Sequence, residues 1–273
     1  MLSAVEHWGH YATGQKTFRQ LPSWVPYWTL SSLTQPLPEK AQLEHSALRY
    51  TASPERSQLQ VKGLELGIIK DAGNAFLEFI PRVGNSVPEY SALKWATESY
   101  QMARWRQWEC MASKVSVYPT GEAVRRAYIR TLVADSLPQQ PSSFRALESI
   151  YNSWLRFWRI VGIERGRFLD YYTSNTSPQD AQNAISFMAA HTTASYGRRF
   201  FVTREGYFGL GPFQTRKGDR VVALCGGKTL YILRHHRRKG SLKEWKILGE
   251  FYLHGVQRDI LQINTDYQTF SLR

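Results

Sequence analysis

Two kinds of side chain in this sequence could take part in chemistry: a histidine at the end of an apolar run, and a group of aromatic residues. His254 in "FYLHG" follows apolar residues and precedes a glycine, a pattern that can present a side chain at the end of a sheet. It could act there as an acid or base, or only as a hydrogen-bonded structural residue. Tyr27 can donate a hydrogen bond without carrying a charge, and it forms the predicted catalytic pair with His254. Trp24, Trp28 and Tyr207 are predicted to bind substrate as pocket walls, because ligand sites combine apolar walls with a few polar groups.

The sequence lacks the signatures of other common chemistries. It contains no G-x-S-x-G, H-E-x-x-H or C-x-x-C motif. Two histidine pairs, His7 with His10 and His235 with His236, have no third ligand residue beside them. The stretch "CGGKT" lacks the first glycine of a phosphate-binding loop and is predicted to be a turn. We therefore expect neither a metal nor a cofactor.

The composition is that of a globular protein without a membrane segment. Of its 273 residues, 42% are hydrophobic, and no run approaches the roughly 18 apolar residues of a membrane-spanning helix. The first twenty residues lack the apolar centre of a signal peptide. Cys110 and Cys225 lie far apart, and both are predicted to be small buried residues in a reducing compartment. A cytoplasmic location is therefore expected, with no membrane partner.

A formal net charge of +13 is the most unusual bulk feature. It favours an anionic partner, with nucleic acid as one class. However, the basic residues are dispersed, and the concentrated cluster Arg234 to Lys243 is predicted to be a solvated hairpin loop. The sequence also carries no zinc-finger, basic-zipper or RNA-recognition signature. Nucleic acid is therefore not the expected partner.

The periodicity of the sequence predicts the elements that must position these residues. The segment "LPSWVPYW" is predicted to be a stiff extended strap, because each proline fixes its own φ and restricts the residue before it. Alternation over Ser57 to Gly63, continuing to about Lys70, predicts a bent strand or strand pair. Helical periodicity predicts four helices, at residues 90–113, 119–135, 143–162 and 178 to about 191, of which the second opens with a turn and the fourth is capped by Ser177. Five β-rich runs between about residues 198 and 255 then predict an antiparallel meander.

These elements predict the α+β fold class. The expected architecture is an antiparallel β-barrel-like sheet, built from the N-terminal strands and the C-terminal meander, with a helical insertion of about four helices. We expect a single domain over residues 1–273. Its parts are an N-terminal strap and strands at 1–84, the helical insertion at 85–195, and the C-terminal meander at 196–273.

Three stretches carry a resemblance to a known family. They are "LPSWVPYW", "YPTGEAVRRAYIRTLVAD" and the block from "RRFFVTREGYFGLG" to "GEFYLHGV". Together they resemble the C-terminal half of fungal heterokaryon-incompatibility (HET domain) proteins. The characteristic HET-domain motifs are not found, so the chain is expected to start where that domain would end. At Tyr27 this sequence departs from the family, whose members generally have an acidic residue there.

The resemblance implies that this chain, without the HET domain that triggers cell death, is not a self-sufficient effector. With the aromatic content of 14% and the missing nucleophile, metal and cofactor signatures, it favours a cofactor-independent enzyme. The predicted reaction is that of a cyclase, a pericyclase such as a Diels-Alderase, or an isomerase of fungal secondary metabolism, acting on an apolar small molecule. Such reactions need mainly a shaped cavity and one or two hydrogen-bond donors. The alternative is a non-enzymatic recognition or regulatory module related to heterokaryon incompatibility, with a protein partner.

Overall fold

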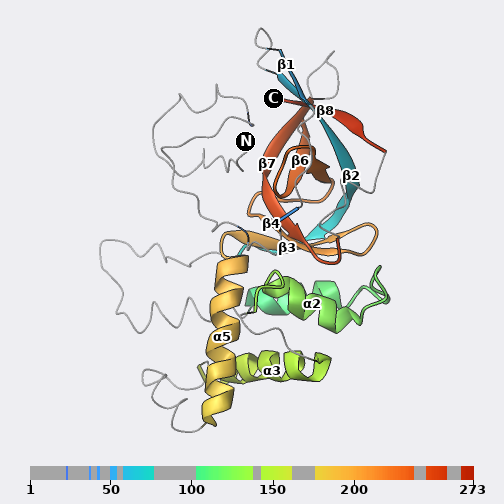
Figure 1. The fold of residues 1–273 in the computed structure, drawn as a ribbon. Helices are drawn as coiled ribbons and strands as arrows, with labels where there is room; N and C mark the ends of the chain where they lie inside the picture. The colour runs from blue at the N-terminus through green and yellow to red at the C-terminus, as the bar shows by residue number, and fades with distance from the viewer. Residues whose placement is uncertain are drawn as a thin grey trace, which may run out of the picture.

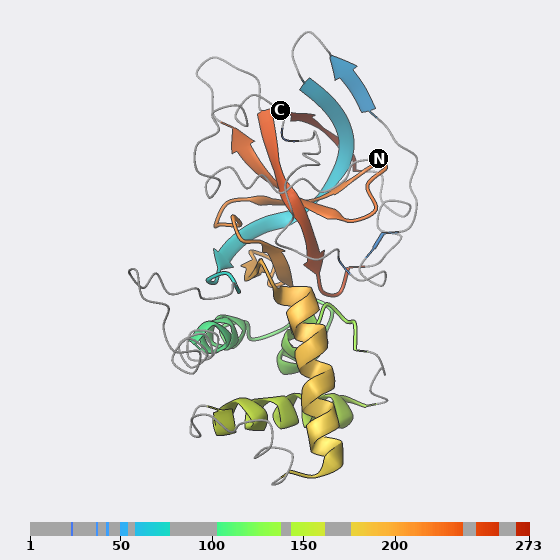
Figure 2. The same cartoon turned by 90° about the vertical axis from the view of Figure 1, so that its left-hand side faces the viewer.

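The strands gather at one end of the molecule and the helices at the other, as the two views in Figures 1 and 2 show. The computed structural model describes residues 23, 37, 42–43, 50–53, 58–76, 103–137, 143–161, 176–236, 244–256 and 266–273. Within these residues, all the helices come between the second and third strands in chain order. The α+β class is therefore confirmed, with the helices inserted between early and late strands.

Six strands of one eight-stranded sheet close into a ring. Their order is β2-β3-β4-β7-β6-β5, and a pairing between β2 and β5 completes the circle. Strand β1 pairs with β2, while β8 pairs antiparallel with β2 and parallel with β7. In chain order the strands are β1 (Tyr50–Ser53), β2 (Gln58–Ala72), β3 (Arg198–Thr203), β4 (Phe208–Pro212), β5 (Arg220–Leu224), β6 (Leu230–His236), β7 (Glu244–Leu253) and β8 (Gln268–Leu272).

Strand β2 is long enough to pair with several neighbours in turn. Its first half pairs with β1 and β8, its middle with β5, and its last residues with β3. Gly63 allows the close approach of β5, because a Cβ there would lie 2.7 Å from the carbonyl oxygen of Ala223. A register shift between Glu65 and Gly67 marks an irregularity in the same strand. Of the two possibilities predicted for this stretch, the structure has the single bent strand.

Successive side chains along each strand pack into different hydrophobic clusters, because neighbouring side chains of a strand point to opposite faces of the sheet. Phe201 on β3 packs with Ile69 and Phe251, whereas its neighbour Phe200 faces the helices. On β5, Val221 joins the Phe201 cluster while Val222 joins a third cluster with residues of β8. Both faces of these strands are therefore buried, which explains why their sequences are almost continuously apolar.

Four helical segments in the described residues cover one side of the ring. They are residues 103–112, α2 (Val124–Leu132), α3 (Phe144–Val161) and α5 (Pro178–Ser195). Their inner faces bury four tryptophans, at positions 105, 108, 154 and 158. The Trp105 ring lies 4.5 Å from that of Trp154 and 4.8 Å from that of Trp158. These four tryptophans therefore belong to the core of the helical layer.

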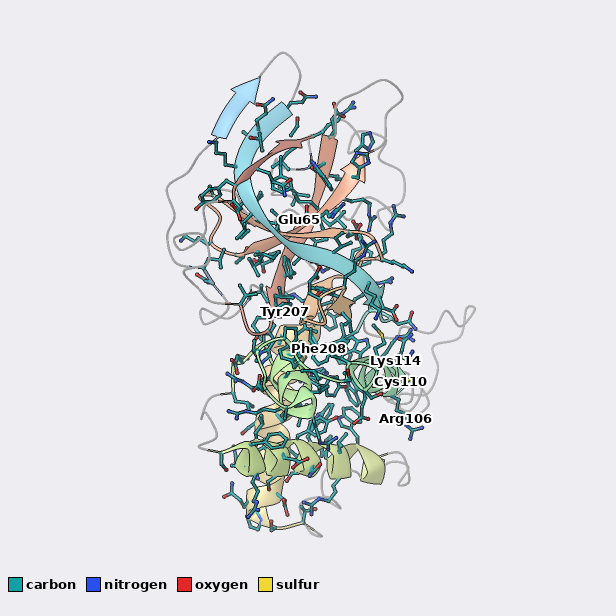
Figure 3. The ribbon with its side chains drawn as sticks, turned by 90° about the vertical axis from the view of Figure 1, so that its right-hand side faces the viewer. Glu65, Arg106, Cys110, Lys114, Tyr207 and Phe208 are labelled. Atoms are coloured by element: carbon teal, nitrogen blue, oxygen red, sulfur yellow. The ribbon has the colours of Figure 1, made fainter. Side chains whose placement is uncertain are left out.

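Several local predictions need correction. The segment at residues 119–135 opens with turns, as predicted, with the Gly121 N–H bonded to the Tyr118 carbonyl at 2.9 Å, and its helix α2 begins at Val124. Strands β1 and β8 were not predicted. Cys225 is buried as expected, but Cys110 is exposed, on the same outward side of its helix as Arg106 and Lys114 (Figure 3). The division of residues 1–273 into three parts of a single domain stays a prediction.

The start of α5 confirms the predicted cap and yields a test. Ser177 Oγ accepts a hydrogen bond from the Asp180 N–H at 3.1 Å, and Pro178 occupies the first turn. We expect Ser177→Ala to lower the free energy of unfolding by about 1 kcal/mol, since one amide at the helix start loses its partner. Urea unfolding measures this value. Ser186→Ala, within the same helix, is the control and should change it by less than about 0.5 kcal/mol; equal effects would contradict the capping role.

Candidate functional site

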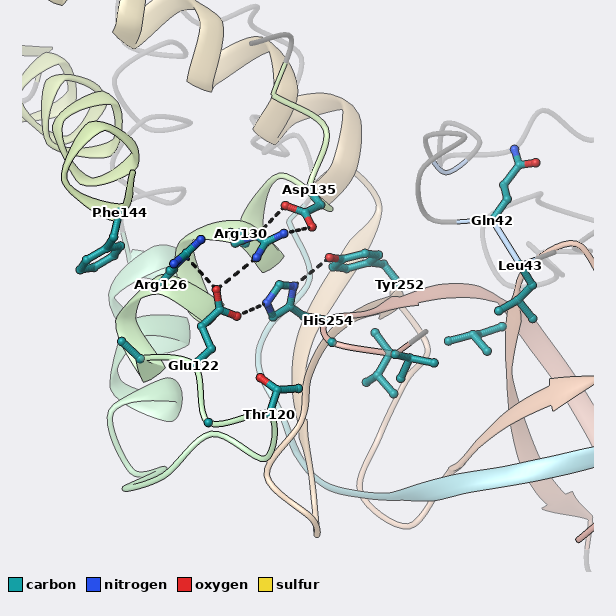
Figure 4. Close-up of a pocket in the computed structure, with 16 residues that line it drawn as sticks. Gln42, Leu43, Thr120, Glu122, Arg126, Arg130, Asp135, Phe144, Tyr252 and His254 are labelled. Atoms are coloured by element: carbon teal, nitrogen blue, oxygen red, sulfur yellow. Dashed lines mark hydrogen bonds and ion pairs between the residues drawn. The ribbon is translucent and has the colours of Figure 1, made fainter. Parts of the chain in front are cut away.

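A pocket of about 850 Å³ lies between the start of α2 and the end of β7 (Figure 4). One side is formed by residues 120–123 with Arg126, Arg130 and Asp135, and the other by residues 252–256. Leu43 and Leu230 add apolar surface to the wall. The helical layer and the strand ring therefore both contribute to this pocket.

His254 is held in the pocket wall by its backbone. Its N–H donates to the Phe208 carbonyl at 2.9 Å, and its carbonyl accepts from the Tyr118 hydroxyl at 2.9 Å. The next residue, Gly255, has a φ of +84°, and a Cβ there would lie 2.7 Å from Cγ2 of Thr120. The glycine after the histidine thus lets the chain turn at the end of the sheet. This placement agrees with the position predicted from "FYLHG".

Both ring nitrogens of His254 are engaged. Nε2 lies 2.6 Å from Glu122 Oε2, and Nδ1 lies 3.0 Å from the Tyr252 hydroxyl. Burial lowers the pKa of His254, although contact with Glu122 partly offsets the effect. Burial also raises the pKa of Tyr252 well above its usual value, so that this hydroxyl keeps its proton. The neutral imidazole therefore donates a hydrogen bond from Nε2 to the carboxylate and accepts a hydrogen bond from the Tyr252 hydroxyl at Nδ1.

Two arginines surround the other oxygen of Glu122. Oε1 lies 3.2 Å from Arg130 Nη1 and 3.0 Å from Arg126 Nε. Arg130 also makes a bidentate contact with Asp135, at 2.7 and 2.5 Å, and this pairing raises the Arg130 pKa. The two carboxylates and two guanidinium groups sum to zero charge. The pocket floor is thus a closed ion-pair network and not an isolated catalytic charge.

The spacing of three charged residues in the sequence indicates part of this network, which was not predicted. Glu122, Arg126 and Arg130 are spaced four residues apart in "GEAVRRAYIR". This spacing places opposite charges on one side of a helix and its preceding turn. The contact with His254 is different, because it joins residues 132 positions apart and depends on the tertiary fold.

The predicted site residues do not all lie within the described structure. Tyr27, Trp24 and Trp28 lie outside the described residues, so their predicted roles stay predictions. Tyr207 lies at the junction of ring and helices (Figure 3), 6.0 Å from the Tyr118 ring, and is not among the residues that line the pocket.

One residue of the predicted strap, Ser23, is described and buried. Its hydroxyl accepts from the Ile247 N–H at 3.0 Å and donates to the carbonyl of Arg273. Ile247 lies near the start of β7, whereas His254 follows the end of that strand. The strap is thus anchored to the ring at Ser23.

The described ranges also bear on metal binding and on membrane insertion. No group of three or more histidine, cysteine, aspartate or glutamate side chains there is arranged to hold a metal ion. Among the same ranges, no helix combines the length and apolar character needed to cross a bilayer.

Comparison with known proteins finds a similarity in the C-terminal part of the chain. Residues 145–272 match the family model described as the Het-6 beta-barrel domain. A 76-residue stretch is 32% identical to heterokaryon incompatibility protein 6, OR allele, of Neurospora crassa; it covers 28% of this chain and 11% of that protein. No solved structure matches. The matched region holds α3 from its second residue, α5 and strands β3 to β8, and it supplies the strand side of the pocket but not Glu122 or Arg126. Over its C-terminal part this chain resembles fungal heterokaryon-incompatibility proteins, as its sequence motifs predicted.

Proposed function

We propose that this chain is a non-enzymatic recognition module related to heterokaryon incompatibility, and that its pocket binds a segment of a partner protein. The observation that carries this proposal is the full engagement of His254, whose two nitrogens already contact Glu122 and Tyr252. An acid or base needs a proton position directed at its substrate. A residue bonded on both sides instead fixes the shape of the pocket wall.

The enzyme hypothesis has less support. It requires aromatic walls around an apolar small molecule, but the aromatic side chains lining this pocket in the described structure are Phe144 and Tyr252. Of the five described tryptophans, four pack in the helical layer, and Trp245 packs against a cluster of the strand ring and does not line the pocket. The similarity to a heterokaryon-incompatibility protein also favours recognition over secondary metabolism. A cytoplasmic setting belongs to the proposal and is supported by the two cysteines being free thiols.

The proposal is tested by comparing which proteins the chain labels when its pocket is open and when a large side chain fills the pocket. The full chain is fused to a promiscuous biotin ligase and expressed in a filamentous fungus. Thr120 is exposed at the pocket, so Thr120→Trp should fill the pocket without disturbing the core. We expect a defined set of proteins to be labelled at least about fivefold more by the unaltered chain than by Thr120→Trp. These proteins are then purified and titrated directly against both variants.

A matched control places the same bulk elsewhere. Ser149 is exposed on α3 and does not line the pocket, so Ser149→Trp should label the same proteins as the unaltered chain. Identical labelling by all three proteins would contradict the proposal. The purified chain is also incubated with a fungal small-molecule extract and followed by mass spectrometry. Catalytic conversion that Thr120→Trp abolishes would support the cyclase or isomerase hypothesis instead.

A further inference from the structure

Among the charged side chains that line the pocket, Arg126 has a buried nitrogen without a hydrogen-bond partner in the described residues. Its Nε lies 3.0 Å from Glu122 Oε1, but this buried nitrogen has no hydrogen-bond partner within the described residues. The Arg126 side chain as a whole is 43% exposed. Arg130 differs, since it holds Asp135 through two nitrogens and Glu122 through a third. The buried Nε faces Glu122 and is closed to a ligand, so the donors that Arg126 can offer are the terminal nitrogens of its partly exposed guanidinium group.

The carboxylate oxygens in the pocket, in contrast, already have partners within the protein. One oxygen of Glu122 faces Arg130, the other faces His254, and both oxygens of Asp135 face Arg130. A ligand that brings a positive charge would have to break one of these pairs. A ligand that brings a carboxylate can bind the two terminal nitrogens of Arg126 without breaking any of them, since Nε alone faces Glu122.

The far side of the pocket is apolar. Leu43, Leu230 and Leu253 are each at most 9% exposed, and together with Val256 they line the wall beyond His254. Figure 4 places Leu43 on the opposite side of His254 from Arg126. A ligand that fills the pocket therefore meets a cationic donor at one end and aliphatic side chains at the other.

We propose that the pocket recognises a peptide segment in which an acidic side chain lies close to apolar residues. The acidic group binds Arg126, and the apolar residues cover Leu43, Leu230 and Leu253. The net charge of +13 favours approach of an acidic partner over a basic one. This inference rests on the proposed function and adds to it the chemistry of the partner.

The probe is a displayed library of random dodecapeptides selected against the full chain. Peptides that also bind the Thr120→Trp chain are removed, so that the retained peptides are pocket binders. We expect them to be enriched in aspartate or glutamate next to leucine, isoleucine, valine or phenylalanine. The tightest peptides are then synthesised and titrated by fluorescence anisotropy.

Variants of one residue test the contact with the acidic group. Arg126→Ala should weaken binding about tenfold or more, as should replacement of the peptide's Asp by Asn or Glu by Gln. Arg126→Lys should retain part of the affinity, since it keeps the charge but not the fork. Arg145→Ala removes an exposed arginine of α3 that does not line the pocket, and should change binding less than twofold. The circular dichroism and thermal midpoint of each variant verify its fold.

The outcomes separate the two proposals. Pocket-binding peptides without acidic enrichment, or with unchanged affinity for Arg126→Ala, would overturn the acidic preference and leave peptide recognition standing. A selection that yields no pocket-dependent peptide at all would count against both the recognition function and its acidic preference.

Discussion

Lowering the pH from about 7 to about 4 is expected to reduce the free energy of unfolding by about 3 kcal/mol through His191 alone. Burial lowers the pKa of His191 to about 4, against an ordinary value of 6.5. As the pH falls through this interval, the unfolded chain binds a proton that the folded chain excludes. Stability is therefore complete above about pH 6.5, falls as the pH drops toward 4, and takes no further loss from this residue below it.

The surroundings of His191 explain the size of this effect. Nε2 accepts a hydrogen bond from the Trp105 indole at 2.7 Å, and Nδ1 lies 3.0 Å from the Leu132 carbonyl. The rings of Phe76 and Trp154 pack within 5.3 Å of the imidazole. These contacts suit a neutral ring, and no carboxylate is found near enough among the described residues to stabilise the charged form.

The measurement compares urea unfolding of the unaltered chain and His191→Gln at several pH values. The glutamine variant is less stable at all pH values but lacks the titrating ring. The difference between the two curves should shrink by about 3 kcal/mol between about pH 7 and pH 4. The comparison removes the contribution of His254, which titrates in both proteins. Parallel curves would mean that His191 is not the proton-excluding group.

Replacing Glu122 by leucine is expected to lower the free energy of unfolding by about 2–3 kcal/mol. The carboxylate contacts His254, Arg126 and Arg130 at once, and its side chain is only 14% exposed. Removing it leaves the buried Nε2–H of His254 without an acceptor. Arg130 is less affected, because Asp135 still holds it.

Glutamine at position 122 separates charge from shape. Its amide oxygen can still accept from His254, so Glu122→Gln should recover about half of the loss. Glu148→Leu serves as the control, because Glu148 pairs with Arg125 on the surface, where both side chains are at least 34% exposed. It should cost less than about 1 kcal/mol. Equal losses for Glu122→Leu and Glu148→Leu in urea unfolding would refute the role of Glu122 as the link between helices and ring.

The fold class followed from local patterns, whereas the closure of the ring did not. Strands β3 to β7 have almost continuous apolar sequences, which predict strands without reference to the rest of the chain. The pairing of β2 with β5 joins residues such as Gly63 and Leu224, far apart in sequence. Strand β8 was missed because only Phe270 and Leu272 of its five residues are buried, too few to produce a clear pattern.

The pocket, like the fold, was predictable only where a local sequence pattern determines the structure. The glycine after His254 predicted a side chain at the end of the sheet, and the structure places it there. Its partners Glu122 and Tyr252 are ordinary residues in the sequence, and only packing of α2 against the ring brings the carboxylate to the histidine. The aromatic content was a weaker guide, because large rings fill a core and line a pocket equally well.

The place of β2 in the ring also has a consequence for how the chain is made. β2 ends at Ala72, yet its partners β3 and β5 begin only at Arg198 and Arg220. At about 5–20 residues per second, synthesis of the intervening helices takes on the order of ten seconds. During that interval, among the strands that the structure describes, a strand carrying Val61 and Ile69 can pair only with the short β1. Unpaired strands of this kind invite association with other chains, so nascent protein needs the most protection from aggregation before β5 leaves the ribosome.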